Sequence, residues 1–219
     1  SSCSTSTIAQ RRSEDNGVTY APVQTIAGAG SCYPELGVSR FDGRVFVSYS
    51  DDTFQNEGFV AVVTSVDFGA TYGAPAQVAD TSPPGGTQVF FPAQIDEGSS
   101  SVLHTGWVEG GTNELEEYTY FDTWSDRSTD AGTSFETDRV VTRNVEHADA
   151  NLQPGTTNWD LATLPDGSVY RTILDGNFDM GYRVYYSLSS TGETFSIPEP
   201  VDDRFPDYTA QSPVIEHRS

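Results

Sequence analysis

The chain of 219 residues carries 32 acidic residues against 11 basic ones, all of them arginine, for a net charge of −21. A surface this acidic repels phosphate groups, which excludes binding to nucleic acids and to anionic lipid surfaces. No run of about 18 apolar residues occurs, so the sequence predicts no membrane span. The charge is spread along the chain. It either keeps the protein soluble or, as in a halophilic protein, suits high salt, where ions screen the repulsion between the acidic residues.

The two cysteines, Cys3 and Cys32, favour one disulfide that tethers the N-terminal segment, provided that the protein is secreted. Two unpaired thiols are the alternative. A lipidated Cys3 is disfavoured because two serines precede it. No signal peptide is visible, but a leader could precede Ser1. The sequence holds no CxxC pair or Cys/His cluster, which argues against a zinc site.

One pattern recurs along the chain: Ser-x-Asp-x-Gly-x-(Thr or Ser)-aromatic. Its three intact copies are Ser13, Asp15, Gly17, Thr19 and Tyr20; Ser65, Asp67, Gly69, Thr71 and Tyr72; and Ser128, Asp130, Gly132, Ser134 and Phe135. A fourth, degenerate copy keeps Gly192, Thr194 and Phe195, and we expect it to lack the first serine and the aspartate. In such a turn the carboxylate accepts backbone N–H groups, and the glycine takes a positive φ.

The segments around these turns repeat as well. In chain order, segment 5–27 reads as strand, turn, strand. Three complete units follow at 33–80, 90–142 and 157–202, each with two strands joined by a tight turn, a third strand, the Ser-x-Asp-x-Gly turn and a fourth strand. Their third strands are expected at Gly58–Ser65, Tyr118–Ser128 and Gly181–Ser189. Segment 208–219 has the pattern of a first strand. Each complete unit therefore predicts a four-stranded antiparallel sheet.

On these motifs the chain resembles the sialidase-like β-propellers built from Asp-box (BNR) repeats. The resemblance implies an all-β fold, a β-propeller of four-stranded antiparallel blades with Asp-box turns, with three full blades and two partial blades. The whole chain, 1–219, is then a single propeller domain or a portion of a larger one. A four-bladed ring closed by the two partial blades is one arrangement. We favour the other, a fragment of a six- or seven-bladed propeller.

Candidate ligand residues lie on the first strands, which line the central channel of a propeller. They are Tyr33, Glu35, Phe91, Gln94, Trp159, Asp160 and Gln211. Carboxylates among them could serve as the pair that glycosidases need, and aromatic rings could stack on sugars. The competing interpretation, which we favour, is that these side chains only pack the blade centres.

No catalytic residue can be assigned from the resemblance. Sialidases clamp a sugar carboxylate with three arginines, the first in a Phe/Tyr-Arg-Ile-Pro motif, and this sequence has no such motif. The acidic surface would also repel an anionic sugar, whereas neutral sugars suffer no such repulsion.

The function we expect is a secreted or cell-surface module that binds carbohydrate or protein without a catalytic set of its own. One alternative is an exo-acting glycoside hydrolase whose catalytic residues lie partly outside this chain. The other is a structural subunit of an extracellular assembly, in which other chains cover open blade faces. No cofactor is expected. Acidic loops such as Asp51-Asp52 could hold Ca²⁺, although a solvated loop is the favoured interpretation.

Overall fold

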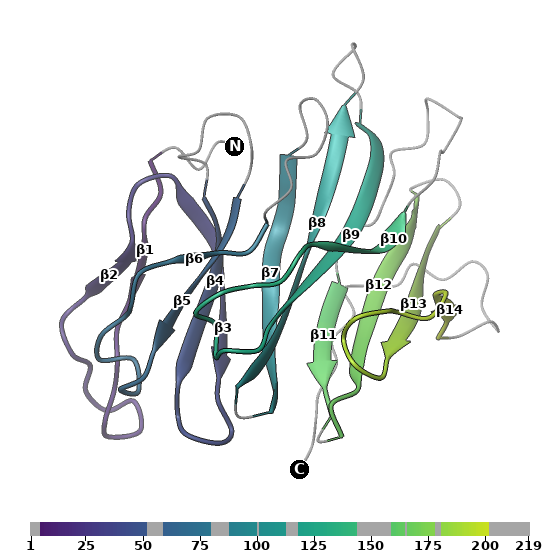
Figure 1. Cartoon of the computed structure of the whole chain (residues 1–219). Helices are drawn as coiled ribbons and strands as arrows, with labels where there is room; N and C mark the ends of the chain where they lie inside the picture. The colour runs from purple at the N-terminus through teal and green to yellow at the C-terminus, as the bar shows by residue number, and fades with distance from the viewer. Residues whose placement is uncertain are drawn as a thin grey trace.

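The computed structural model describes residues 5–51, 59–79, 88–99, 101–112, 118–143, 159–164, 166–177 and 181–201. Within these ranges the protein is all-β, with fourteen strands and no helix. The strands form four antiparallel sheets that stand side by side in a row (Figure 1). The order of the sheets along the row follows the order of the chain, so each sheet packs mainly against its sequence neighbours.

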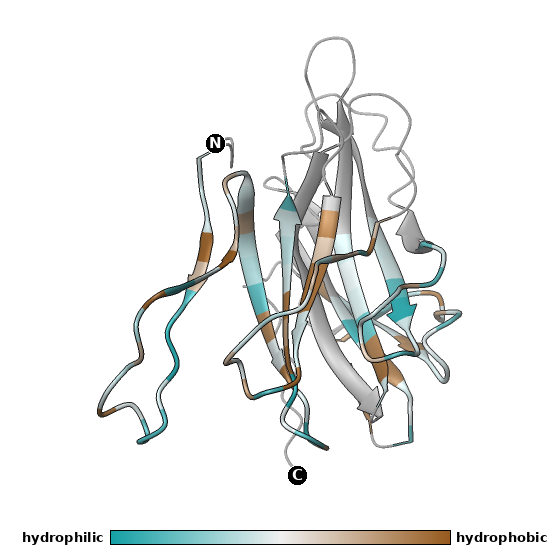
Figure 2. Ribbon diagram, turned by 60° about the vertical axis from the view of Figure 1, so that its left-hand side comes forward, coloured by the Kyte–Doolittle hydropathy of each residue, from teal (hydrophilic) through white to brown (hydrophobic). Residues whose placement is uncertain are grey.

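The first sheet has only two described strands, β1 (Ile8–Gln10) and β2 (Gln24–Ala27). It lies at one end of the row (Figures 1 and 2). The turn between its strands holds the first copy of the Ser-x-Asp-x-Gly pattern, as expected for segment 5–27.

The other three sheets share one design of four strands in sequential order. They comprise β3 (Ser31–Val38), β4 (Val45–Asp51), β5 (Phe59–Ser65) and β6 (Ala76–Gln77); β7 (Gln88–Ser99), β8 (Val102–Thr112), β9 (Tyr118–Ser128) and β10 (Arg139–Arg143); and β11 (Trp159–Thr163), β12 (Val169–Asn177), β13 (Gly181–Ser189) and β14 (Glu199–Pro200). The third strands β9 and β13 have the predicted bounds, and β5 has the predicted end. The expected first strand in 208–219 lies outside the described residues.

The pairing register is the same in all three sheets. The serine that opens each turn closes the third strand and pairs with the first or second residue of the second strand: Ser65 with Val45, Ser128 with Leu103, and Ser189 with Val169. A position in one sheet therefore has a defined equivalent in the others, counted from these pairs.

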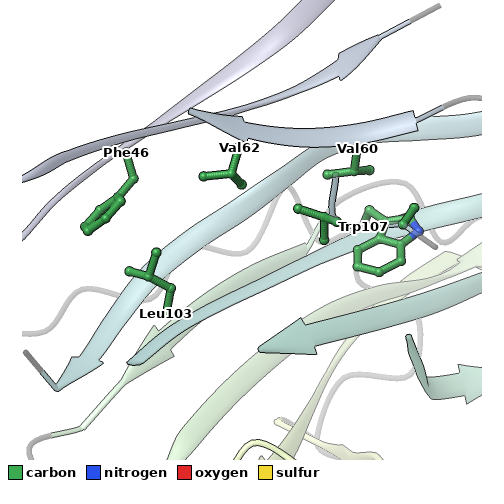
Figure 3. Packing of buried hydrophobic residues seen from close by; sticks show 7 residues of the cluster. Phe46, Val60, Val62, Leu103 and Trp107 are labelled. Atoms are coloured by element: carbon green, nitrogen blue, oxygen red, sulfur yellow. The ribbon is translucent and has the colours of Figure 1, made fainter. Parts of the chain in front are cut away.

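The hydrophobic core lies between the sheets. One cluster joins the β3–β6 sheet to the β7–β10 sheet through Phe46, Val60, Val62, Leu103 and Trp107 (Figure 3). A second cluster, which includes Ile8, Val47 and Val63, joins the β1–β2 sheet to the β3–β6 sheet. The strands of the β3–β6 sheet are thus apolar on both faces, as expected for a sheet with a neighbour on each side.

The intact turns share one hydrogen-bond network. In the second turn Gly69 N–H donates to Ser65 Oγ (2.8 Å), Ser65 Oγ donates to Asp67 Oδ1 (2.8 Å), and Thr71 donates to Asp67 through N–H (2.8 Å) and hydroxyl (2.7 Å). The turns at Ser13 and Ser128 repeat these bonds with distances between 2.6 and 2.9 Å.

The fourth turn corrects one expectation, because it does not lack its serine. Gly192 N–H donates to Ser189 Oγ at 2.8 Å, as Gly69 does to Ser65. The turn is one residue shorter, with a spacing of three between the two residues instead of four. The intact turns place two consecutive residues at positive φ, for example Phe68 (58°) and Gly69 (79°), whereas in the fourth turn only Gly192 (74°) has a positive φ.

Candidate functional site

The first strands of the three four-stranded sheets come together in space. β7 contacts both β3 and β11. Each is the edge strand of its sheet, opposite the short fourth strand. Side chains on β3, β7 and β11 can therefore meet although they are far apart in the sequence.

Three of the predicted ligand residues occupy equivalent positions on these strands. Glu35 pairs with Ser48, Gln94 with Gly106 and Asp160 with Thr172. Each partner lies three residues after the residue that pairs with the turn serine, which is Val45, Leu103 or Val169. The common register brings one polar residue from each sheet to the same level.

Glu35 and Asp160 are coupled electrostatically. Burial raises the pKa of the half-buried Glu35 carboxyl above its usual value, and the negative charge of Asp160 raises it further. Asp160 is also half-buried, and its Oδ1 accepts a hydrogen bond from Leu161 N–H at 2.9 Å. Two interacting carboxylates from different sheets share one surface, and the first holds its proton to a higher pH than a free glutamate.

Tyr33 precedes Glu35 by two residues on β3 and has an unusual backbone conformation. Its φ is +52°, in the left-handed region that few residues other than glycine adopt. It falls within an irregularity of the β3–β4 ladder between Cys32 and Glu35, and its side chain is 46% exposed. The corresponding part of β7, between Phe90 and Gln94, is irregular as well. Such bulges re-aim side chains and are frequent next to binding sites.

The remaining predicted site residues are less fully placed. Phe91 and Gln94 lie on β7 and Trp159 on β11, but their side chains are outside the description. Gln211 lies outside the described residues. Cys32 forms a disulfide, and the only other cysteine of the chain, Cys3, is also outside them.

Across the part of the chain that the structure describes, no group of three or more His, Cys, Asp or Glu side chains could hold a metal ion. The described residues also contain no helix that is long and apolar enough to cross a membrane. The chemistry that these ranges offer at the first strands is that of carboxylates and an aromatic ring: hydrogen-bond acceptance, proton transfer and stacking.

Sequence reasoning did not single out Arg171, which is completely buried in the second strand of the last sheet. Its Nη2 donates to Trp124 O (2.7 Å), and its guanidinium lies over the Phe195 ring, 5.3 Å from the centroid. A Cβ on Gly106 would lie 1.3 Å from Nη2, so the glycine makes room for the arginine. The sequence signal for this buried arginine was Gly106, a glycine in the second strand of the neighbouring sheet. It can be interpreted only once the two sheets are known to pack together. Arg171 therefore holds two sheets together. This role is structural and separate from that of the carboxylate pair.

Comparison with known proteins places the fold. No protein-family model matches the sequence, and no curated protein matches it significantly. Solved structures do match. An α-L-arabinanase of Penicillium chrysogenum complexed with arabinobiose shares 18% identity over 90% of this chain and 58% of its own, with a TM-score of 0.55. The NanB sialidase of Streptococcus pneumoniae shares 14% identity over 93% of this chain and 29% of its own, with a TM-score of 0.58.

A polysaccharide lyase, an ulvan lyase, is similar as well, with 10% identity over 88% of this chain and 48% of its own and a TM-score of 0.54. The chain thus spans less than two thirds of each of these proteins. At such identities the likeness concerns the fold alone, which is that of the sialidase- and arabinanase-like β-propellers.

Proposed function

We propose that this chain forms part of an extracellular β-propeller that binds a neutral carbohydrate along its first strands. In this proposal the turns are Asp boxes, and the sheets at 33–80, 90–142 and 157–202 are blades, with a partial blade at 5–27. The observation that carries the proposal is the pair of interacting carboxylates, Glu35 and Asp160, at equivalent register positions of two first strands that both contact β7.

The chemistry of the pair suits sugar hydroxyls. Carboxylates accept hydrogen bonds from hydroxyl donors, and such charge-assisted bonds are roughly twice as strong as neutral ones. Tyr33, which is 46% exposed and precedes Glu35 on the same strand, would add an aromatic ring for stacking. A chain with a net charge of −21 repels anionic sugars, so neutral glycans such as arabinan fragments are the favoured class. The disulfide of Cys32 supports an oxidising, extracellular location.

Calorimetric titration with neutral and anionic oligosaccharides tests this function. We expect binding of a neutral oligosaccharide that weakens at least tenfold in Glu35→Gln and in Asp160→Asn. Glu14→Gln is the matched control, because Glu14 is an exposed carboxylate on the β1–β2 turn, away from the first strands. Equal affinity in all four proteins, or binding of none of the sugars by the wild type, would refute the proposal.

Glycoside hydrolysis is the second candidate, and the raised pKa of Glu35 favours it. Retaining and inverting glycosidases both use one protonated and one ionised carboxyl group. Glu35 would serve as the acid that protonates the leaving oxygen, and Asp160 as the second carboxyl group of the pair. Turnover of aryl glycosides that Glu35→Gln abolishes, with a rate that falls as the pH rises through the Glu35 pKa, would support catalysis. Binding without turnover of any aryl glycoside would leave the chain a binding module.

A further inference from the structure

The first strand of the β3–β6 sheet holds one residue more than the strand beside it. β3 and β4 pair at Cys32–Ser50 and again at Glu35–Ser48. Between these pairs, two residues of β3 lie opposite one residue of β4, which makes a β-bulge. Tyr33, the first of the two, has a φ of +52°, where the Cβ of a residue other than glycine is crowded. Such a strained conformation persists only where its surroundings fix it.

The residues after the bulge are fixed by a regular ladder and a tight turn. The pairs from Glu35 to Val38 follow one register without interruption. In the turn that follows, Asp42 N–H donates to Ser39 Oγ at 3.2 Å, and Asp42 forms an ion pair with Arg44 at 2.7 Å. A shift of the strand on this side of the bulge would break these contacts.

The residues before the bulge are held by the N-terminal segment instead. Ser6 O accepts hydrogen bonds from Gly30 N–H (3.0 Å) and Ser31 N–H (3.3 Å). Cys32 forms a disulfide, for which Cys3 is the only other cysteine of the chain. We call Ser6 together with this disulfide the strap. The strap fixes three consecutive residues of the chain directly before the bulge.

A shift of these three residues by one position would remove the bulge. Cys32 would then pair with Asp51 and Tyr33 with Ser50, in the register that the rest of β3 already follows. Tyr33 would adopt an extended conformation without the left-handed strain, and its side chain would take a regular place on the face of its new partner. The shift moves the strand by about 3.3 Å along its axis, and the strap opposes this movement.

We propose that the strap is a redox-sensitive device that positions Tyr33 at the carbohydrate site. The inference rests on the proposed function, in which Tyr33 stacks on the sugar. A dithiol reductant opens the disulfide by two exchanges: two electrons and two protons pass to the cysteine sulfurs, which become thiols, and the dithiol closes to its own disulfide. The hydrogen bonds to Ser6 O then no longer suffice against the strain, and β3 relaxes to the register without the bulge. Glu35 keeps its place because the turn anchors its register.

Calorimetric titration of the oxidised and the reduced protein with a neutral oligosaccharide tests the proposal. We expect reduction by a dithiol to weaken binding roughly tenfold, which is the population shift that the strain of one left-handed residue corresponds to. Reoxidation should restore the affinity. Tyr33→Ala lacks the ring, so reduction should change its affinity little. An equal loss in both proteins would show that the disulfide does not act through Tyr33 and would overturn the proposal.

Two further variants separate positioning from general stability. Cys3→Ser removes the disulfide, so it should bind as weakly as the reduced wild type and should not respond to the dithiol. Arg12→Ala is the matched control, because Arg12 Nη1 ties the β1–β2 sheet to Phe68 O of the next turn at 3.4 Å, away from β3. It should lower the free energy of unfolding but leave the affinity unchanged. A loss of affinity in Arg12→Ala as large as in Cys3→Ser would count against the strap.

The backbone of Tyr33 tests the strap separately from sugar binding. The NMR coupling between its amide and α protons reports φ. On reduction it should change from the left-handed to the extended value, while the backbone contact between Glu35 and Ser48 persists. A reduced protein in which Tyr33 keeps its left-handed φ would overturn the proposal. If Tyr33 responds to reduction but no glycan binds the oxidised protein, that result supports the strap and refutes the carbohydrate function alone.

Circular dichroism checks that the reduced protein folds. If it does not, Ser31→Pro serves in its place. Proline is tolerated at the first position of a strand, and here it removes one hydrogen bond to Ser6 O while the disulfide stays. The coupling of Tyr33 should then move towards the extended value, and no change in it would count against the proposal.

Discussion

The first turn and the second turn differ in burial, not in their internal bonds. Gly17 N–H and Gly69 N–H both donate to the turn serine at 2.8 Å, and both aspartates accept a threonine N–H at 2.8 Å. Ser65 is 1% exposed, however, whereas Ser13 is only half-buried. The turn geometry is therefore encoded within about eight residues, and the preceding sheet adds burial afterwards. The following substitutions separate the two contributions.

The largest difference is expected between Gly192→Ala and Gly17→Ala. Both glycines have a positive φ, 74° and 86°, so a Cβ costs about 1–2 kcal/mol in either turn. At Gly192 the Cβ would also collide with the His104 ring, at 2.2 Å from Cε1, which adds about 1–3 kcal/mol of overpacking. Chemical denaturation measures both free energies of unfolding. The added substitution His104→Ala should remove part of the cost of Gly192→Ala, and strict additivity would contradict the contact.

Ser65→Ala and Ser13→Ala should differ next. Without the hydroxyl, the buried Gly69 N–H loses its partner, which costs about 1–3 kcal/mol. Water can replace Ser13 at the exposed first turn, so we expect less than about 0.5 kcal/mol there. Equal losses in the two variants would mean that burial of the turn does not matter. In the fourth turn, Ser189→Ala should resemble Ser65→Ala, whereas Ser190→Ala should have little effect.

Tyr72→Phe and Tyr20→Phe give a smaller contrast. The Tyr72 hydroxyl donates to Gln10 Oε1 of the preceding sheet at 2.7 Å, and its loss should cost about 0.5–1.5 kcal/mol. Tyr20 is largely exposed, so Tyr20→Phe should leave the unfolding midpoint unchanged. A midpoint that falls as far in Tyr20→Phe would show that the first turn is also covered.

Acid titration should show the least difference between the two turns. Hydrogen bonds from Thr19 and from Thr71 lower the pKa of Asp15 and of Asp67 from 3.8 to about 2. Because the folded pKa lies below the unfolded one, the stabilisation is complete above about pH 4 and is lost as the pH falls towards 2. Asp15→Asn and Asp67→Asn should each remove a similar share of this pH dependence. A dependence confined to Asp67 would contradict the equivalence of the two networks.

The sequence predicted what depends on local pattern. The ends of β5, β9 and β13 follow from the turn serines, and the positions of Glu35 and Asp160 follow from the same repeat. Ser189 was missed because a deletion within the turn shifts the spacing on which the pattern depends.

The packing between sheets could not be predicted in this way. The room that Gly106 leaves for Arg171 and the coupling of Glu35 to Asp160 join residues of different sheets. The repeat specifies each sheet but not which side chains meet across the gap, because that depends on how the sheets stack.

The most direct test of the proposed function follows the carboxyl resonances of Glu35 and Asp160 by NMR. Glu35 should titrate at a higher pH than an ordinary glutamate, and at a lower pH in Asp160→Asn than in the wild type. Addition of a neutral oligosaccharide should shift both resonances to saturation. If Glu35 titrates normally and no neutral glycan moves either resonance, the first strands do not carry the carbohydrate site.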